Sequence, residues 1–414
     1  MPRTTTVIIG AGQAGLAMSR SLARLGIEHV VLERGKVAQR WRTQSWDSLR
    51  LLTPNWMTRL PGFHYVGPDP DGFMTAPELI TFLERYADAS NAPVLTDTAV
   101  TGVERDCGGY RVTTDRGVWH AQSVVIATGY CERAFVPDAA RRVPAHIQQT
   151  AAPDYKRPGD LPPGGVLVVG ASASGVQIAE ELQRSGRQVV LAAGRHLRMP
   201  RHYRGADILW WLDRIGVLSR SSGDVYSLED ARRQPSMQLA GRPDHASIDL
   251  GTLHTIGVRV RGRLLEVDGD GVWFGDDLAA TTAAADVKLA ALLERIDEFI
   301  ARSATLADPR PPFAPTWPLG VADSAGRLRL DREGIGTVVW ATGYRRAYPW
   351  LRVPVLDAYG EIAHSGGVTD AAGLYVLGMN FQRRRNSSFI DGVGDDARMM
   401  AAHLAQLVAG RRVA

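Results

Sequence analysis

The chain has 414 residues, which is enough for two or three domains that each bury a core. Apolar residues make up 45% and charged residues 22%, a balance that excludes global disorder, collagen-like repeats and coiled coil. The formal net charge of +4 provides no argument for nucleic acid as a partner. Cys107 and Cys131 are too far apart for a CxxC pair or a zinc site and too few for a disulfide framework. We expect a cytoplasmic protein with no signal peptide and no membrane partner, because no apolar run approaches the ~18 residues of a membrane span.

The amino-terminal residues predict a parallel strand–helix–strand unit. An apolar strand at 5–9 is followed by a glycine-rich turn at 10–15, a helix at 16–25 and a second apolar strand at 30–32. This unit has the length of a βαβ motif and predicts an α/β fold with a doubly wound sheet.

The turn in this unit has the GxGxxG spacing, with Gly10, Gly12 and Gly15 at the glycine positions. Such a turn lets a pyrophosphate approach the main chain at the positive end of the helix. Glu33 ends the second strand, close to the position at which an acid holds a ribose hydroxyl. We therefore expect a dinucleotide here; the alternative is a glycine-rich turn in another kind of doubly wound sheet.

A second unit of the same kind begins at residue 166, after a Pro- and Gly-rich stretch at 156–165 that we interpret as a linker. Its turn reads GxSxxG, because Ser172 replaces the middle glycine between Gly170 and Gly175. The second unit therefore predicts a second dinucleotide site with a somewhat weaker motif.

No acid closes the last strand of this second unit. Arg195 follows it instead, with Arg198 and Arg201 close behind. Arginine can hold a 2′-phosphate by paired hydrogen bonds, so the pattern favours NADPH. The alternative is a solvated arginine cluster beside loosely bound NADH.

Two dinucleotide sites imply two cofactors, one that delivers hydride and one that accepts it. Flavin is the usual acceptor, because its ring passes electrons on as pairs or singly. The absence of CxxC excludes the disulfide-reductase use of such an architecture. The electrons must then go to oxygen, a quinone, a protein partner or a small organic acceptor.

Two nearly identical apolar strands, 124–130 and 338–344, both end in Ala-Thr-Gly-Tyr. Each falls where the chain would pass from one domain to another. The expected domains are a first FAD-binding part at 1–160, an NADPH-binding domain at 161–335 with an insertion at 220–335, and a return to the FAD-binding domain at 336–414. Within the insertion, a helical stripe of packing residues is predicted at Leu289, Leu292, Leu293, Ile296 and Ile300.

These features resemble the flavin-containing monooxygenases, above all the plant indole-pyruvate (YUCCA-type) enzymes and their bacterial relatives. The resemblance is carried by the two turns, both Ala-Thr-Gly-Tyr strands, the Pro-Trp-Leu at 349–351, the segment from Trp41 to Pro54 and the closing strand at 373–378. It covers both ends and the middle of the chain and leaves 220–335 largely unsupported.

The resemblance implies two Rossmann-like domains, with FAD on the first unit and NADPH on the second. It implies an enzyme that inserts one oxygen atom of O₂ into a small organic substrate through a flavin C4a-hydroperoxide, which bound NADP⁺ shields from water. The cofactor-binding residues that it implies are Gly10, Gly12, Gln13, Ala14, Gly15, Glu33, Arg34, Trp41, Arg42, Thr128, Gly129, Gly170, Ser172, Ser174, Gly175, Arg195, Arg201, Ala341, Thr342, Gly343, Gly378 and Asp391.

The chain departs from the family pattern at two places. The FxGxxxH signature before the second unit is broken around His146. Leu52 occupies the position where the family has a flavin-contacting Asn or Asp, so the neighbouring Thr53 and Asn55 are the candidate catalytic residues. If neither supplies the contact, the protein is a flavin reductase or an H₂O₂-forming oxidase without productive oxygenation.

Three adjacent arginines, Arg383, Arg384 and Arg385, follow the closing strand. They are expected either to bind an anionic substrate or cofactor phosphate, or to form a solvated loop. A last helix is predicted at 397–408, and its amino terminus is expected to face the flavin or to carry ordinary N-terminal acids.

Overall fold

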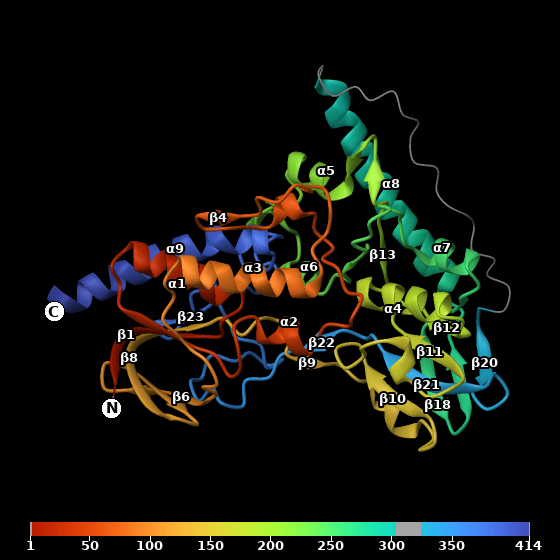
Figure 1. Ribbon diagram of the computed structural model, residues 1–414, viewed down its shortest axis with the longest axis horizontal. Coiled ribbons are helices and arrows are strands. Elements are labelled where there is room, and N and C mark those ends of the chain that lie inside the picture. The colour runs from red at the N-terminus through yellow and green to blue at the C-terminus, as the bar shows by residue number, and fades with distance from the viewer. Residues whose placement is uncertain (1, 304–323, 414) are drawn as a thin grey trace.

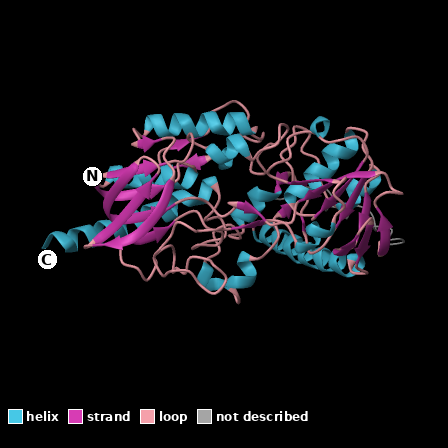
Figure 2. Cartoon of the chain, turned by 90° about the horizontal axis from the view of Figure 1, so that it is seen from below, coloured by secondary structure: helices cyan, strands magenta, loops and turns pink. Residues whose placement is uncertain are grey.

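The computed structural model describes residues 2–303 and 324–413. Its main strands gather in two sheets at opposite ends of the molecule (Figure 1), and Figure 2 shows helices and loops between these two groups. The parallel strands of both sheets confirm the predicted α/β class.

The first sheet contains the amino-terminal unit and has seven strands. In order across the sheet they are β5 (Val94–Leu95), β2 (His29–Leu32), β1 (Arg3–Ile9), β8 (Gly117–Ile126), β7 (Gly109–Thr114) and β6 (Val100–Asp106), with β23 (Leu374–Val376) also on β8. Strands β5, β2, β1, β8 and β23 run parallel, whereas β6 and β7 form an antiparallel meander with β8.

Helices cover one face of this sheet. They are α1 (Gln13–Arg24), α3 (Ala76–Ala89) and α9 (Ile390–Val413). Ile8 of the sheet, Leu16 of α1 and Leu404 of α9 are fully buried in the apolar core that the sheet shares with these helices. The two ends of the chain are thus packed into one domain, as the adjacent α1 and α9 of Figure 1 show.

The second sheet contains the second predicted unit and is entirely parallel. Its order is β10 (Gln148–Ala151), β21 (Ile335–Trp340), β11 (Gly165–Val169), β12 (Val189–Ala192) and β17 (Arg259–Arg261). Two apolar cores contain residues of this sheet. One includes the helices α4 (Ala173–Arg184) and α7 (Leu250–Thr255), and the other includes a small antiparallel sheet of β18 (Leu264–Asp268), β19 (Gly271–Phe274) and β20 (Gly326–Arg329).

The chain passes from one sheet to the other at residues that differ from the expected domain boundaries. Because β10 and β21 both belong to the second sheet, the chain enters that domain before residue 148 and leaves it after residue 340, instead of at 160 and 335. The crossings lie side by side, since β9 (Arg133–Ala134) pairs with β22 (Tyr344–Arg345).

The insertion contains the predicted helical stripe. It forms part of α8 (Leu278–Arg302), in which Leu289, Leu292 and Ile296 are buried. These residues pack with α5 (Ile208–Arg214) and with Met57 of the first domain, so this cluster joins the two domains.

The remaining elements are short. They are α2 (Gln39–Thr43), β3 (Arg59–Leu60), β4 (Phe63–His64), β13 (Leu197–Arg198), β14 (His202–Tyr203), β15 (Ala206–Asp207), α6 (Leu228–Arg232), β16 (Met237–Gln238) and 3-10 helices at Asn55–Met57, Asp138–Arg142, Pro158–Asp160 and Ser222–Asp224. Across residues 2–303 and 324–413, no helix has both the length and the apolar character that crossing a membrane requires.

Candidate cofactor sites and active site

The first glycine-rich turn has the geometry of a phosphate cradle. Gly10 has a φ of +104°, and a Cβ at this position would lie 2.8 Å from the carbonyl oxygen of Ala127. A Cβ at Gly15 would lie 1.9 Å from the carbonyl oxygen of Gly10, so only glycine lets α1 start this close to β1. A Cβ at Gly12 would meet nothing within 4 Å, which leaves open space above the free N–H groups at the start of α1.

The carboxylate of Glu33 fixes the backbone of this turn through hydrogen bonds. Its carboxylate is buried; Oε2 accepts a hydrogen bond from the Ala11 backbone N–H at 2.8 Å, and Oε1 accepts one from the Gly35 N–H at 3.1 Å. In this structure, the acid that we expected to hold a ribose fixes the backbone of the turn. Arg34, the next residue, is exposed at the same edge of the sheet.

The backbone φ and ψ angles of the second turn nearly equal those of the first. Gly170 has a φ of +108°, and a Cβ there would lie 2.4 Å from the carbonyl oxygen of Ala341. Ser172 precedes α4 with φ −83° and ψ −174°, and Gly12 precedes α1 with φ −85° and ψ −173°. These angles are open to any residue, which is why serine is compatible with the middle position. Gly175 packs on Gly170 in the same way as Gly15 packs on Gly10.

Each Ala-Thr-Gly-Tyr segment supports one of the turns. The Ala127 N–H donates to the carbonyl oxygen of Ile9 at 2.9 Å, and the Ala341 N–H donates to that of Val169 at 2.8 Å. These bonds place each segment against the strand end from which its turn begins. The side chain of Thr342 donates to the carbonyl oxygen of Phe135, whereas the Oγ1 of Thr128 is buried without a partner in the described chain.

The other residues expected at the first site gather around this turn. Gly378 follows β23, and its Cβ would lie 2.9 Å from the Cβ of Ala14, so the end of the closing strand touches the start of α1. Trp41 of α2 is half-buried against the first core, and Arg42 forms an ion pair with Glu84. Gln13 lies in the first turn and Gly129 in the first Ala-Thr-Gly-Tyr segment, and Ser174 and Gly343 lie in the second turn and the second such segment.

The arginines after β12 separate into different roles. Arg195 is exposed directly beyond the strand end. Arg198 is buried between Asp249 and Asp286. Arg201 has no exposed surface, because its guanidinium pairs with Asp207 and donates to the carbonyl oxygen of Leu52 at 2.8 Å.

Arg201 therefore joins the second domain to the first and does not face solvent, which corrects the expectation that it would hold a phosphate. Its guanidinium also lies over the ring of Phe73, 4.8 Å from the centroid. Of Arg195, Arg198 and Arg201, only Arg195 is exposed.

A polar group that the sequence analysis did not identify lies between the two domains. The thiol of Cys131 interacts with Arg40 and Tyr130, and the Arg40 guanidinium lies 5.3 Å from the ring centroid of Tyr344. Burial raises the pKa of Cys131 even though Arg40 opposes the shift, so this thiol is protonated near neutral pH. The hydroxyl of Tyr130 also interacts with Ser388. Arg40 directly precedes Trp41 in the sequence, which is the only local signal that could have pointed to it.

The two candidate catalytic residues lie on one segment at the domain interface. Asn55 is 5% exposed, and its Nδ2 donates to the carbonyl oxygen of Asp69 at 2.8 Å. Its Oδ1 is buried without a partner in the described chain. Thr53 is half-buried. Leu52 packs in the same apolar cluster as Phe389, which immediately precedes α9.

The arginine triplet is anchored, and it does not form a solvated loop. Arg383 pairs with Asp396 at 3.4 Å, and Arg384 pairs with Asp395 at 2.6 Å. Burial raises the pKa of Asp396, whose side chain is fully buried. Arg385 contacts the Oε1 of Gln234 at 3.4 Å, and its pKa is lowered by burial and by Arg220.

The last helix begins earlier than predicted, at Ile390 instead of residue 397. Gly392 lies in its first turn, where a Cβ would be 1.9 Å from the carbonyl oxygen of Asn386, so only glycine fits at this position. Asp391 is paired with Arg59, with Nη2 to Oδ2 at 2.9 Å, which ties the start of α9 to the segment that follows Asn55. His146 lies apart from these groups, exposed and 3.8 Å from Asp270.

Comparisons with known proteins agree with this geometry. A family profile described as pyridine nucleotide-disulphide oxidoreductase matches residues 7–210. An uncharacterised CzcO-like oxidoreductase of Geobacillus kaustophilus is 31% identical over 394 residues, which cover 94% of this chain and 95% of that protein. The indole-3-pyruvate monooxygenase YUCCA1 of Oryza sativa is 29% identical over 301 residues, which cover 65% of this chain and 72% of that protein.

Among solved structures, a flavin-containing monooxygenase from Stenotrophomonas maltophilia superimposes with a TM-score of 0.69 at 18% identity, covering 98% of this chain and 99% of the other. This likeness extends over both domains and shows the two-domain fold. The predicted oxidoreductase class is confirmed by the full-length relative from Geobacillus kaustophilus. The chain belongs to the family of the CzcO-like oxidoreductases, and it shares the two-domain fold of the flavin-containing monooxygenases.

Proposed function

We propose that this chain uses NADPH and O₂ to insert one oxygen atom into a small organic substrate, with FAD on the first turn and NADPH on the second. The observation that carries this proposal is the repetition of one backbone geometry at 10–15 and 170–175 in a chain without a CxxC pair. Electrons on a flavin with no dithiol beside it pass to O₂, a quinone, a protein partner or a small organic acceptor, and we propose O₂.

The first site fits FAD by its open space and its free donors. The backbone N–H groups at the start of α1 would bind the pyrophosphate beneath Gly12, while Glu33 keeps the turn in place. The unpartnered Oγ1 of Thr128 would donate to the cofactor from the end of β8. The flavin, when bound, supplies the two-electron exchange between NADPH and O₂.

The second site would hold NADPH on the turn at 170–175, with its 2′-phosphate on Arg195. The guanidinium of Arg195 is exposed at the carboxyl end of β12, where the second strand of a βαβ unit meets the ribose. A 2′-phosphate takes paired hydrogen bonds from arginine, and NADH offers no such group.

Asn55 is the proposed catalytic residue, and Thr53 is the second candidate. The Nδ2 of Asn55 donates to the carbonyl oxygen of Asp69, which fixes the orientation of the amide. Its unpartnered Oδ1 is therefore held in a position to accept a hydrogen bond from a reacting group. The apolar cluster beside it, which includes Met57, Trp211 and Phe389, would keep water from the reacting atoms.

The alternative is NADPH oxidation without oxygen transfer. It is favoured by Leu52, whose side chain joins the apolar cluster and offers no polar group at the position that the family resemblance assigns to Asn or Asp. The two functions differ in where the oxygen atoms go: into a product and water, or into H₂O₂.

The test is to measure whether ¹⁸O from labelled O₂ enters an organic product. FAD-loaded protein is given NADPH under ¹⁸O₂ with a panel of thioethers, tertiary amines and aryl 2-oxo acids, the last chosen because of the indole-3-pyruvate relative. We expect one ¹⁸O atom in a product and fewer moles of H₂O₂ than of NADPH consumed. Stoichiometric H₂O₂ with every substrate, and no labelled product, would establish the oxidase function instead.

A further inference from the structure

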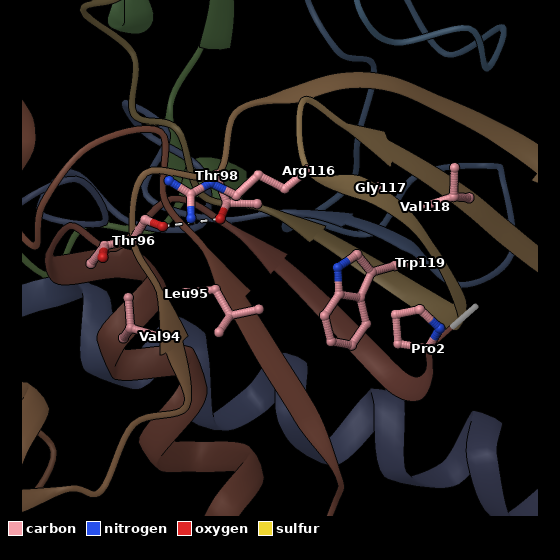
Figure 3. A pocket seen from close by; sticks show the side chains of 9 residues that line it. All are labelled: Pro2, Val94, Leu95, Thr96, Thr98, Arg116, Gly117, Val118 and Trp119. Atoms are coloured by element: carbon pink, nitrogen blue, oxygen red, sulfur yellow. Dashed lines mark hydrogen bonds between the residues drawn. The ribbon is translucent and has the colours of Figure 1, made fainter.

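A pocket opens in the first domain away from both glycine-rich turns. Its volume is about 450 Å³, within the range of small-molecule sites. Figure 3 shows its lining residues, which are Pro2, Val94, Leu95, Thr96, Thr98, Arg116, Gly117, Val118 and Trp119. No residue of either turn contributes to it, and neither does Glu33.

The walls of this pocket are fixed by the sheet. On one side β5 pairs with β2, with Leu95 opposite Leu32. On the other side, the turn between β7 and β8 is held to the segment before β6, because the Ala99 N–H donates to Asp115 Oδ1 at 2.9 Å and the Asp115 N–H donates to the Ala99 carbonyl oxygen at 3.0 Å. Backbone hydrogen bonds therefore fix both walls of the pocket, which lies between the β5 edge of the sheet and the β6–β8 meander.

Its apolar part consists of two side chains that face the same space. Leu95 is 41% exposed, and Trp119 is only partly buried against the core beneath the meander. In Figure 3 the indole ring and the leucine side chain border the opening together. A flat apolar group would bury both of them.

The polar part of the pocket offers donors and a positive charge. Among the residues that the structure describes, neither the Arg116 guanidinium nor the Trp119 indole N–H has an ion-pair or hydrogen-bond partner. The Arg116 backbone is fixed by its N–H bond to Thr114 Oγ1 at 3.1 Å. The nearest acid along the chain, Asp115, is engaged with Ala99 through Oδ1. A planar guanidinium fits a carboxylate through two parallel hydrogen bonds.

We propose that this pocket binds a small organic carboxylate with a flat apolar body, its carboxylate on Arg116 and its body between Trp119 and Leu95. The pocket also connects to the FAD site through the backbone of Glu33. The Glu33 N–H donates to the carbonyl oxygen of Leu95 at 3.0 Å, and its carbonyl oxygen accepts from the Thr98 N–H at 2.8 Å. A ligand that immobilises Leu95 and Thr98 therefore slows the release of FAD.

The test uses 2-naphthoate as the probe and 2-naphthamide as its neutral match. Each is titrated calorimetrically into FAD-loaded protein saturated with NADP⁺. We expect one site for 2-naphthoate, binding about tenfold weaker for 2-naphthamide, and a loss of about tenfold in R116Q, as removal of one charge-assisted pair predicts. The control is R105Q, which removes an exposed arginine of β6 that lies over Tyr110 outside the pocket.

A second variant, L95E, places a negative charge beside the proposed carboxylate and is expected to abolish binding while the protein keeps its FAD. The site would be overturned by equal affinity for the two probes, by equal losses in R116Q and R105Q, by the absence of binding at millimolar concentration, or by release of FAD or NADP⁺ on titration. The link to the cofactor is read from the rate of FAD release on dilution. If saturating 2-naphthoate leaves that rate unchanged, the link through Glu33 is wrong.

Discussion

The Oε2 of Glu33 accepts a hydrogen bond from the Ala11 N–H at 2.8 Å, so the end of the second strand fixes the turn that follows the first. The bond runs from a buried carboxylate to a backbone amide, a class worth roughly 1.5–3 kcal/mol. In E33Q a neutral acceptor replaces the charged one. We expect FAD to bind about tenfold more weakly, which a fluorescence titration of the apoprotein with FAD would measure.

The control for this variant is E104Q. Glu104 pairs with Arg111 on the surface of the meander, and its loss should leave FAD affinity unchanged. Equal FAD affinity in E33Q and in the unchanged protein would show that the turn does not depend on the carboxylate.

Gly170 provides a test that separates the two cofactor sites. Alanine there would place a Cβ 2.4 Å from the carbonyl oxygen of Ala341 at a φ of +108°, which combines strain with a backbone clash. We expect G170A to lower the free energy of unfolding by more than about 2 kcal/mol and to raise the KM for NADPH, with FAD content unchanged.

The matched variant is G186A, where φ is +88° but a Cβ meets nothing within 4 Å. Its cost should be the strain alone, about 1 kcal/mol, with no change in KM. Loss of FAD from G170A with normal NADPH binding would reverse the assignment of the two turns.

Arg195 is expected to determine the choice between the two nicotinamide cofactors. R195Q removes the exposed guanidinium beyond β12 and should raise the KM for NADPH about tenfold while the KM for NADH stays the same. R184Q, which breaks a surface pair with Glu180 on α4, serves as the control. An equal change for NADPH and NADH would contradict the proposed phosphate contact.

Asn55 and Thr53 are distinguished by how much oxygen reaches the product. In N55L the unpartnered Oδ1 is lost from a buried position, and we expect less product per NADPH, by about tenfold, with a matching rise in H₂O₂. The T53V variant should show a smaller effect if Asn55 is the catalytic residue. Both variants must first be shown to retain FAD, because Asn55 also donates to the Asp69 carbonyl oxygen.

The lowered pKa of His364 predicts that the free energy of unfolding falls in acid. Burial, Arg232 and Arg346 lower its pKa from 6.5 to about 4. Its Nδ1 accepts from the Gly367 N–H, and its Nε2 lies 3.3 Å from Arg232 Nη2, so a protonated ring has no acceptor for either group. Between pH 6.5 and about 4 the unfolded chain binds the extra proton, and the stability that is fully present above pH 6.5 therefore falls by on the order of 2 kcal/mol.

Chemical denaturation at several pH values would measure this loss, with H364Q as the variant whose profile should be flatter. Burial also lowers the pKa of His29 and His196, so a residual slope of the same sign should remain in H364Q. A profile that H364Q leaves unaltered would show that His364 titrates normally.

The two turns could be predicted from the sequence because their requirements are local. Gly10 and Gly170 need a positive φ, and the glycines five residues later let each helix start on its strand, so spacing alone reveals them. The stripe from Leu289 to Ile296 was predictable for a similar reason, since one face of one helix meets one core.

The errors arose where a partner distant in sequence decides the outcome. Arg201 reads as a member of an exposed cluster, but Asp207 and the carbonyl oxygen of Leu52 bury it. The domain boundaries shifted because strand pairing, and not linker composition, assigns β10 and β21 to the second sheet. The last helix was predicted to begin at residue 397, but it begins at Ile390 and includes Gly392, where the chain at Asn386 passes too closely for a side chain.

The contact between Gly378 and Ala14 has a consequence for biosynthesis. The turn at 10–15 is translated before the second domain, but β23, Gly378 and α9, which complete its surroundings, are translated after it. The first domain therefore cannot close until the chain of the second domain has been translated, so we expect FAD to bind only after synthesis of both domains.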